Sequence, residues 1–165
     1  MDDSAPGKPL EVVEVDFSFR RELADKIEGN LANYCYQCGA CVGDCPATTY
    51  SNDFNPRKIM LQALLGQEDV LIGGDSVIWL CTNCYTCYER CPQDVRPIEV
   101  IIALKNLTTE ARRSPEVLDQ IRGSVRETGR TVAWSALVDR RRQELGLEKI
   151  KPAPVDEIQK LLDLT

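Results

Sequence analysis

Histidine is absent from all 165 residues of the chain. Its absence excludes heme or zinc ligation through imidazole, Rieske-type centres, and acid–base catalysis by histidine. No stretch of the sequence approaches the apolar length of a membrane span. The acidic N-terminus also lacks the basic and apolar regions of a secretory signal peptide. We therefore expect neither a membrane span nor export.

Basic residues are fewer than acidic ones, 20 Lys and Arg against 26 Asp and Glu, which gives a net charge of −6. Binding to nucleic acid favours a basic face, so we expect no nucleic-acid partner. The run Arg140-Arg141-Arg142 is too short to alter this balance and is interpreted as a solvated helix face.

What the sequence does contain is eight cysteines, arranged in one pattern that occurs twice. Residues 35–46 read CYQCGACVGDCP, and residues 81–92 read CTNCYTCYERCP. Each is a C-x2-C-x2-C-x3-C-P run, the bacterial spacing for ligation of a 4Fe-4S cluster. Eight thiolates match two clusters of four irons each. The two runs together contain every cysteine of the chain: Cys35, Cys38, Cys41, Cys45, Cys81, Cys84, Cys87 and Cys91.

The spacing also predicts which cysteines share a cluster. Three cysteines two residues apart can ligate one cluster from a single loop, and in two-cluster proteins the fourth ligates the other cluster. We predict one cluster on Cys35, Cys38, Cys41 and Cys91. We predict the other on Cys81, Cys84, Cys87 and Cys45. Pro46 and Pro92 fix the backbone directly after each crossing ligand.

Three other uses of closely spaced cysteines compete with this interpretation. A disulfide framework suits short secreted chains, and closely spaced triplets pair poorly. Structural zinc sites pair two C-x2-C hooks around one ion and need neither the third cysteine nor the following proline. A redox thiol pair needs only a single C-x2-C. The pattern therefore favours iron–sulfur clusters, with zinc as the main competitor, and reduced thiolates fit a cytoplasmic location.

Each cysteine run is followed by an apolar segment that begins with proline. Asn55-Pro56 opens a helix that Gly66 closes, and Pro97 opens a second helix, IEVIIALKNL. The cysteines of the two runs recur at an offset of 46 residues. The sequence therefore predicts a mainly α fold: an α-helical ferredoxin with a pseudo-two-fold repeat around two 4Fe-4S clusters, plus a C-terminal helical extension.

The flanks predict further helices. We expect a short helix capped by Ser18, one opened by Ser114-Pro115 and ended by Gly129, and one over residues 131–145. A stiff Pro152–Pro154 linker precedes a last segment whose Ile158, Leu161 and Leu162 share one face. That segment is too short to be helical alone in water, so we expect it to dock on a neighbouring subunit.

These patterns divide the chain into three predicted parts. Residues 1–29 form an N-terminal extension, and residues 30–107 form the two-cluster helical ferredoxin domain. Residues 108–165 form a C-terminal helical extension that serves as a docking tail.

Three stretches resemble the C subunit of the CoB–CoM heterodisulfide reductases of methanogenic archaea, and the likeness covers residues 30–108. They read NYCYQCGACVGDCP, NPRKIMLQALLG and WLCTNCYTCYERCPQDVRPIEV. The resemblance implies an electron-transfer subunit with no active site of its own in an oxidoreductase of methanogenesis. Electrons would pass from a flavin- and cluster-rich A subunit through both clusters to the catalytic B subunit. The B subunit would then reduce the disulfide of coenzymes M and B.

The resemblance implies a hetero-oligomer with the A and B subunits of heterodisulfide reductase, in single or doubled form, with a hydrogenase or formate dehydrogenase as a further component.

Succinate dehydrogenase-type subunits are disfavoured, because their additional C-x4-C-x2-C run has no cysteines here. Two alternatives stay open: a similar relay subunit of a bacterial-type bifurcating or respiratory oxidoreductase with another terminal substrate, and a cluster module that only scaffolds a complex.

Two groups of side chains near the ligands carry weaker predictions. Tyr34, Tyr36, Tyr85 and Tyr88 flank the cysteines, and we interpret them as packing over the clusters rather than as aids to electron tunnelling. Arg57, Lys58, Arg90 and Arg96 either offset the negative charge of the clusters or are ordinary surface charges.

Overall fold

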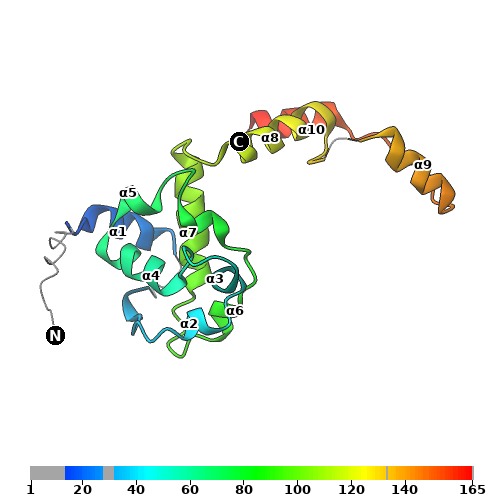
Figure 1. The fold of residues 1–165 in the computed structure, drawn as a ribbon. Helices are drawn as coiled ribbons and strands as arrows, with labels where there is room; N and C mark the ends of the chain where they lie inside the picture. Colours follow the sequence, from blue (N-terminus) through cyan, green and yellow to red (C-terminus); the bar gives the residue numbers. More distant parts are fainter. Residues whose placement is uncertain (1–13, 28–31, 133, 165) are drawn as a thin grey trace, which may run out of the picture. The chain divides into compact units, whose positions relative to one another are not determined.

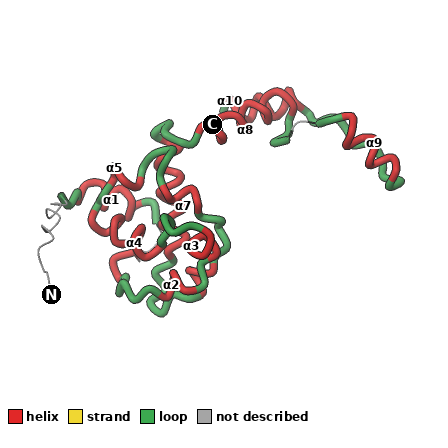
Figure 2. The backbone as a smooth tube through the Cα atoms, in the orientation of Figure 1, coloured by secondary structure: helices red, strands yellow, loops and turns green. Residues whose placement is uncertain are grey.

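The computed structural model describes residues 14–27, 32–132 and 134–164, and every regular element in these ranges is helical (Figures 1 and 2). The predicted mainly α class is confirmed. The chain divides into two compact units, Met1–Arg113 and Ser114–Thr165. The three-part division at residues 29 and 107 stays a prediction. None of the helices within the described ranges is long and apolar enough to cross a membrane.

The first unit is built from short helices joined by loops. The cysteine runs occupy the loops around α2 and α6, and α4 and α7 follow them. In chain order, the elements are α1 (Phe17–Asp25), α2 (Ala40–Gly43), α3 (Pro46–Tyr50), α4 (Pro56–Leu65), α5 (Glu68–Leu71), the 3-10 helix η2 (Val77–Leu80), α6 (Thr86–Glu89) and α7 (Pro97–Glu110).

The bounds of α4 follow from its sequence as predicted. Asn55 caps the helix, because its side-chain oxygen accepts a hydrogen bond of 3.1 Å from the backbone N–H of Lys58. Pro56 takes the first turn, where no backbone donor is needed. Gly66 ends the helix in the left-handed conformation, with φ of 67°. Helix α7 likewise begins with proline, at Pro97, and it packs against α4.

Helices α4 and α7 provide most of the large side chains that are fully buried. The fully buried side chains include Phe54, Ile59, Met60, Leu71, Ile78, Val95, Ile98, Ile101 and Leu104. Three half-buried cysteines, Cys35, Cys81 and Cys91, pack against this core. The loops that carry the cysteines are therefore held on a close-packed base, which limits their movement.

Helix α1 differs slightly from the prediction. Its cap is Asp16 rather than Ser18, because the Asp16 carboxylate accepts hydrogen bonds from the backbone N–H groups of Ser18 and Phe19. A hydrogen bond from the Ser18 hydroxyl and these two backbone bonds lower the pKa of the Asp16 carboxyl below its usual range. Phe19 and Leu23 are buried, and α1 packs against α4 and α7.

The second unit contains α8 (Glu116–Thr128), α9 (Ala136–Glu144) and α10 (Val155–Asp163). Gly129 ends α8 as predicted, with φ of 69°. Helix α9 begins at Ala136, so the expected start at residue 131 is wrong. The reason lies in the preceding loop, where the carbonyl of Arg130 accepts hydrogen bonds from the hydroxyls of Ser124 and Thr128.

Helix α10 lies on α8 of the same chain. The Gln159 amide donates to the carbonyl of Arg126 at 3.0 Å, and the Arg126 guanidinium pairs with Asp163 at 2.7 Å. Ile158 packs against Gly129, since a Cβ atom added there would lie 3.0 Å from Ile158 Cδ1. Ile158 is therefore half-buried against the end of α8 in the same chain, and the docking of this segment on a neighbouring subunit stays a prediction.

Candidate functional site

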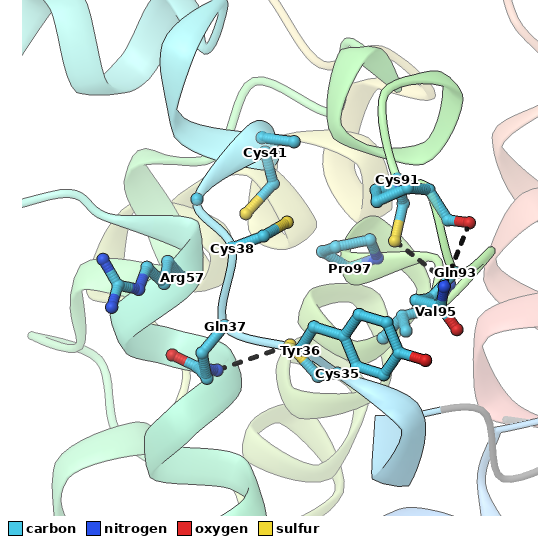
Figure 3. A pocket seen from close by; sticks show the side chains of 13 residues that line it. Cys35, Tyr36, Gln37, Cys38, Cys41, Arg57, Cys91, Gln93, Val95 and Pro97 are labelled. Atoms are coloured by element: carbon cyan, nitrogen blue, oxygen red, sulfur yellow. Dashed lines mark hydrogen bonds between the residues drawn. The ribbon is translucent and has the colours of Figure 1, made fainter.

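Four cysteines from two distant segments gather around one cavity of the first unit. Cys35, Cys38 and Cys41 come from the first run, and Cys91 comes from the second. Figure 3 shows their sulfur atoms bordering a shared space. The cavity encloses about 360 Å³, counting the part open to solvent, and we call it the first cavity.

A second cavity repeats this arrangement with the runs exchanged. Cys81, Cys84 and Cys87 of the second run line it together with Cys45 of the first. It encloses about 320 Å³ on the same measure, close to the volume of the first cavity. The structure thus gathers the eight cysteines in the two groups that the spacing predicts, while their role as ligands stays a prediction.

The two cysteine loops share an unusual backbone conformation. Gln37 and Asn83 occupy equivalent positions and have φ of 55° and 53°. Gly39 and Tyr85, also equivalent, have φ of 85° and 62°. Left-handed residues at these positions turn the chain sharply, so that three cysteines can line one side of a cavity.

The core forms the inner wall of each cavity. Val95 and Pro97 line the first cavity, whereas Phe54, Ile98 and Ile101 line the second. All five are buried. An apolar inner wall keeps water away from whatever the sulfur atoms bind.

Hydrogen-bond donors reach two sulfur atoms of the first cavity. The side-chain amide of Gln37 donates to Cys35 Sγ at 3.4 Å, and the backbone N–H of Val95 donates to Cys91 Sγ at 3.3 Å (Figure 3). In the second cavity, Cys84 Sγ and Thr86 Oγ1 are hydrogen-bonded at 3.5 Å. Such bonds to sulfur stabilise thiolates and raise the reduction potential of a bound cluster.

Burial and hydrogen bonding set the pKa values of the thiols. Burial raises the pKa of Cys41 to about 11 and that of Cys87 to about 12, and neighbouring cysteines contribute to both shifts. Burial also raises the pKa of Cys81, whereas the hydrogen bond with Thr86 lowers that of Cys84. The buried thiols are therefore protonated at neutral pH without metal, and metal binding must displace their protons.

The donor set fits a 4Fe-4S cluster in each cavity. Both linings contain four cysteine sulfurs and no carboxylate. Four thiolates are the ligands that such a cluster requires, and soft sulfur donors favour it over hard cations.

Two of the predicted cations lie close to the cysteines. Arg90 forms an ion pair with Asp44, and these residues occupy equivalent positions of the two runs, each directly before the crossing cysteine. Arg57 lines the first cavity. Arg96 instead pairs with Asp94 and Glu99 and lies 5.4 Å from the ring centroid of Tyr88.

Lys105 was not among the predicted residues, yet its ammonium donates to the backbone carbonyl of Cys81 at 3.1 Å. A usable signal was present, because Lys105 is the one charged residue in the interior of the apolar segment IEVIIALKNL after Glu99. The donors from Gln37 and Val95 to sulfur were missed as well. They depend on loop geometry that the spacing of cysteines does not specify.

Comparison with known proteins agrees with this site. A family model described as a 4Fe-4S dicluster domain matches residues 31–95. The cofactors of this domain are two 4Fe-4S clusters, and its chemistry is electron transfer.

Curated relatives cover more of the chain. The iron-sulfur C subunit of a CoB–CoM heterodisulfide reductase from Methanopyrus kandleri is 33% identical over 79% of this chain and 70% of its own length. The C2 subunit of an H2/formate:CoB-CoM heterodisulfide,ferredoxin reductase from Methanococcus maripaludis is 38% identical, over 72% and 62%. The C subunit of an H2:CoB-CoM heterodisulfide,ferredoxin reductase from Methanothermobacter thermautotrophicus is 30% identical, over 88% and 82%.

Proposed function

Because the chain belongs to the family of heterodisulfide reductase C subunits, we propose that it is the electron relay of such a complex. Electrons enter from a flavin- and cluster-containing A subunit, pass through the two clusters, and leave to the B subunit. The B subunit reduces the disulfide of coenzymes M and B. This chain has no catalytic residue of its own.

One observation carries the proposal: each cavity holds three cysteines of one run and the fourth of the other. The proposed ligands of the first cluster are Cys35, Cys38, Cys41 and Cys91. Those of the second are Cys81, Cys84, Cys87 and Cys45. Each run contributes to both cavities, and Cys41 and Cys45, which line different cavities, are only four residues apart in the chain. Four extended residues span at most about 14 Å, and this short separation favours a relay.

The chain has a definite part in the reaction. When bound, 4Fe-4S clusters provide one-electron transfer at a potential set by their surroundings. The cysteine loops fix the positions of the ligands, and the buried wall of Val95, Ile98 and Ile101 excludes water from the inner side. Such rigidity reduces the reorganisation that accompanies each change of charge.

Reconstitution with separately purified A and B subunits tests the relay. The anaerobically prepared chain should contain about eight iron and eight sulfide, since each cluster has four of each. The A subunit should reduce its clusters, and the B subunit with the coenzyme disulfide should reoxidise them. A Cys38→Ser, Cys84→Ser double variant serves as the control and should abolish delivery.

Three outcomes would contradict the proposal. Zinc in place of iron would exclude the cofactor assignment. Clusters that the A subunit reduces but the B subunit cannot reoxidise would exclude the relay to this substrate and favour a terminal acceptor of another class. Delivery at an unchanged rate without the chain would leave it only a scaffolding role.

A further inference from the structure

Lys105 places a fixed positive charge beside the second cavity. It projects from α7 and is half-buried. Its ammonium donates to the backbone carbonyl of Cys81 and to the side-chain oxygen of Asn83, each at 3.1 Å. Cys81 lines the second cavity, so the positive charge is hydrogen-bonded to the backbone carbonyl of a proposed ligand.

The surroundings hold this ammonium in place. It lies 5.7 Å from the ring centroid of Trp79, a distance at which the cation is attracted to the ring face. The Trp79 indole is itself fixed, because its N–H donates to the carbonyl of Gly73 at 2.8 Å. Three partners therefore orient a side chain that would otherwise have considerable rotational freedom.

The other half of the repeat does not reproduce this arrangement. Lys105 follows Pro97 by eight residues, and the residue eight after Pro56 is Leu64. Asn83 corresponds to Gln37, whose amide donates to a cysteine sulfur of the first cavity. The equivalent side chain of the second loop instead accepts from Lys105. Lys105 thus breaks the pseudo-two-fold symmetry at the second cavity, as Arg57 does at the first, since the residue equivalent to Arg57 at the second cavity is Ile98.

We propose that Lys105 is a positioning residue that raises the reduction potential of the cluster in the second cavity, and of that cluster selectively. Accepting an electron makes a cluster site more negative by one charge. A nearby fixed cation favours the more negative form, and in a half-buried setting this attraction is only partly screened. The inference rests on the proposed binding of a cluster by Cys81, Cys84, Cys87 and Cys45.

A purely structural role makes a different prediction. If Lys105 only ties the cysteine loop to α7, any side chain that donates to the Cys81 carbonyl should replace it. If its charge matters, the replacement must also be cationic. Lys105→Arg keeps both properties, Lys105→Gln keeps a donor without the charge, and Lys105→Met keeps only the apolar stem.

Redox titration of the anaerobic full-length protein, followed by electron paramagnetic resonance, separates these roles. Cys38→Ser and Cys84→Ser variants assign the signals to the two clusters. We expect Lys105→Gln and Lys105→Met to move the midpoint of the second cluster to more negative potential. Lys105→Arg should leave that midpoint near the wild-type value. In all three, the first cluster should shift by less than the second.

A matched control is Lys58→Gln, which removes an exposed cation from the first turn of α4. It should shift the second cluster less than Lys105→Gln does. Several results would overturn the inference: equal shifts in both clusters, a wild-type midpoint in Lys105→Gln, or loss of the second cluster in both neutral variants with retention in Lys105→Arg. Absence of iron from the wild-type protein would instead refute the proposed function itself.

Discussion

Gly39 and Tyr85 occupy the same place in the two cysteine runs but differ in the free energy that their backbone conformation requires. Both have left-handed backbones, which glycine adopts freely and other residues adopt at about 1–2 kcal/mol. Tyr85 lines the second cavity while 47% of its surface stays exposed. Its ring therefore has a role that offsets the backbone strain, and we infer that the ring covers the cluster site.

Replacing Tyr85 by glycine should separate backbone strain from coverage. We expect Tyr85→Gly to unfold at the same temperature as the wild type or slightly higher, because the strain of about 1 kcal/mol is relieved. Its second cluster should nevertheless be lost several-fold faster to oxygen or an iron chelator. Tyr85→Ala, which keeps the strain, should be less stable than Tyr85→Gly. Identical rates of cluster bleaching in all three proteins would argue against coverage by the ring.

The crossing cysteines provide a second test at this scale. Cys45→Ser should disturb the cluster of the second cavity and leave that of the first nearly intact, because Cys45 lines only the second. Cys91→Ser should do the converse. Electron paramagnetic resonance of the two variants, with Cys38→Ser and Cys84→Ser for assignment, measures both effects. Damage to the cluster of the variant's own run would show that the ligands do not cross.

The spacing of cysteines could predict the grouping, because ligation by one loop imposes a short, regular interval. It could not predict what surrounds the sulfur atoms. Gln37 reaches Cys35 within its own loop, but Val95 reaches Cys91 only because the following turn folds back on it. Lys105 lies 24 residues from Cys81, and only tertiary packing brings the two together.

At the level of helices, capping residues and prolines in the sequence predict where a helix begins and ends. Contacts with another helix can shift such a predicted bound. Asn55, Pro56 and Gly66 act within their own turns, so the bounds of α4 agree with the sequence. The start of α9 does not, because residues before it bind to the end of α8. The carbonyl of Arg130 accepts hydrogen bonds from the hydroxyls of Ser124 and Thr128 in α8. Its guanidinium lies 4.9 Å from the ring centroid of Trp134 and donates to the carbonyl of Lys151.

Gly66 ends α4 and also lies against Asp16, the residue that caps α1, so its substitution should destabilise the fold. A Cβ atom at this position would lie 1.9 Å from the backbone oxygen of Asp16, far inside van der Waals contact. With the left-handed backbone added, we expect Gly66→Ala to lower the free energy of unfolding by roughly 2–4 kcal/mol. Thermal or denaturant unfolding of the cluster-loaded protein measures this.

Gly43 gives a control within the same unit. Nothing lies within 4 Å of a Cβ added there, and its φ is outside the left-handed region. Gly43→Ala should therefore leave stability unchanged or raise it by roughly 0.5–1 kcal/mol. Equal stability of the two variants would mean that α1 does not pack on the end of α4 as described.

Over the whole molecule, the cavities and the buried core belong to the first unit. In the second unit, no residue described by the structure is fully buried. Several of its apolar side chains are exposed: Val117, Leu118, Ile121, Leu137, Leu161 and Leu164. A segment of this kind gains stability by covering apolar surface, and another protein of the reductase complex is the partner we expect.

Deleting residues 114–165 should leave both clusters spectroscopically unchanged and weaken binding to that partner. A finer variant is Leu161→Ser, since Leu161 is 64% exposed on α10 and its loss should spare the contact with α8. Burial of such a side chain is worth about 1.5–3 kcal/mol, so we expect affinity to fall by about ten-fold or more. Lys160→Ser is the control. Loss of clusters on deletion, or unaltered binding, would contradict this role.

The exchange of one cysteine between the two cavities has a consequence for biosynthesis. As the ribosome releases the chain, the first run emerges with only three of the four cysteines of the first cavity. The fourth cysteine of this run, Cys45, belongs to the second cavity, whose other three cysteines have not yet been synthesised. Under the proposed ligation, the second site is complete only when residue 87 has been made, and the first only when residue 91 has been made. Insertion of either cluster must then follow synthesis of most of the second run, and a nascent chain interrupted before Cys87 can mature neither cluster.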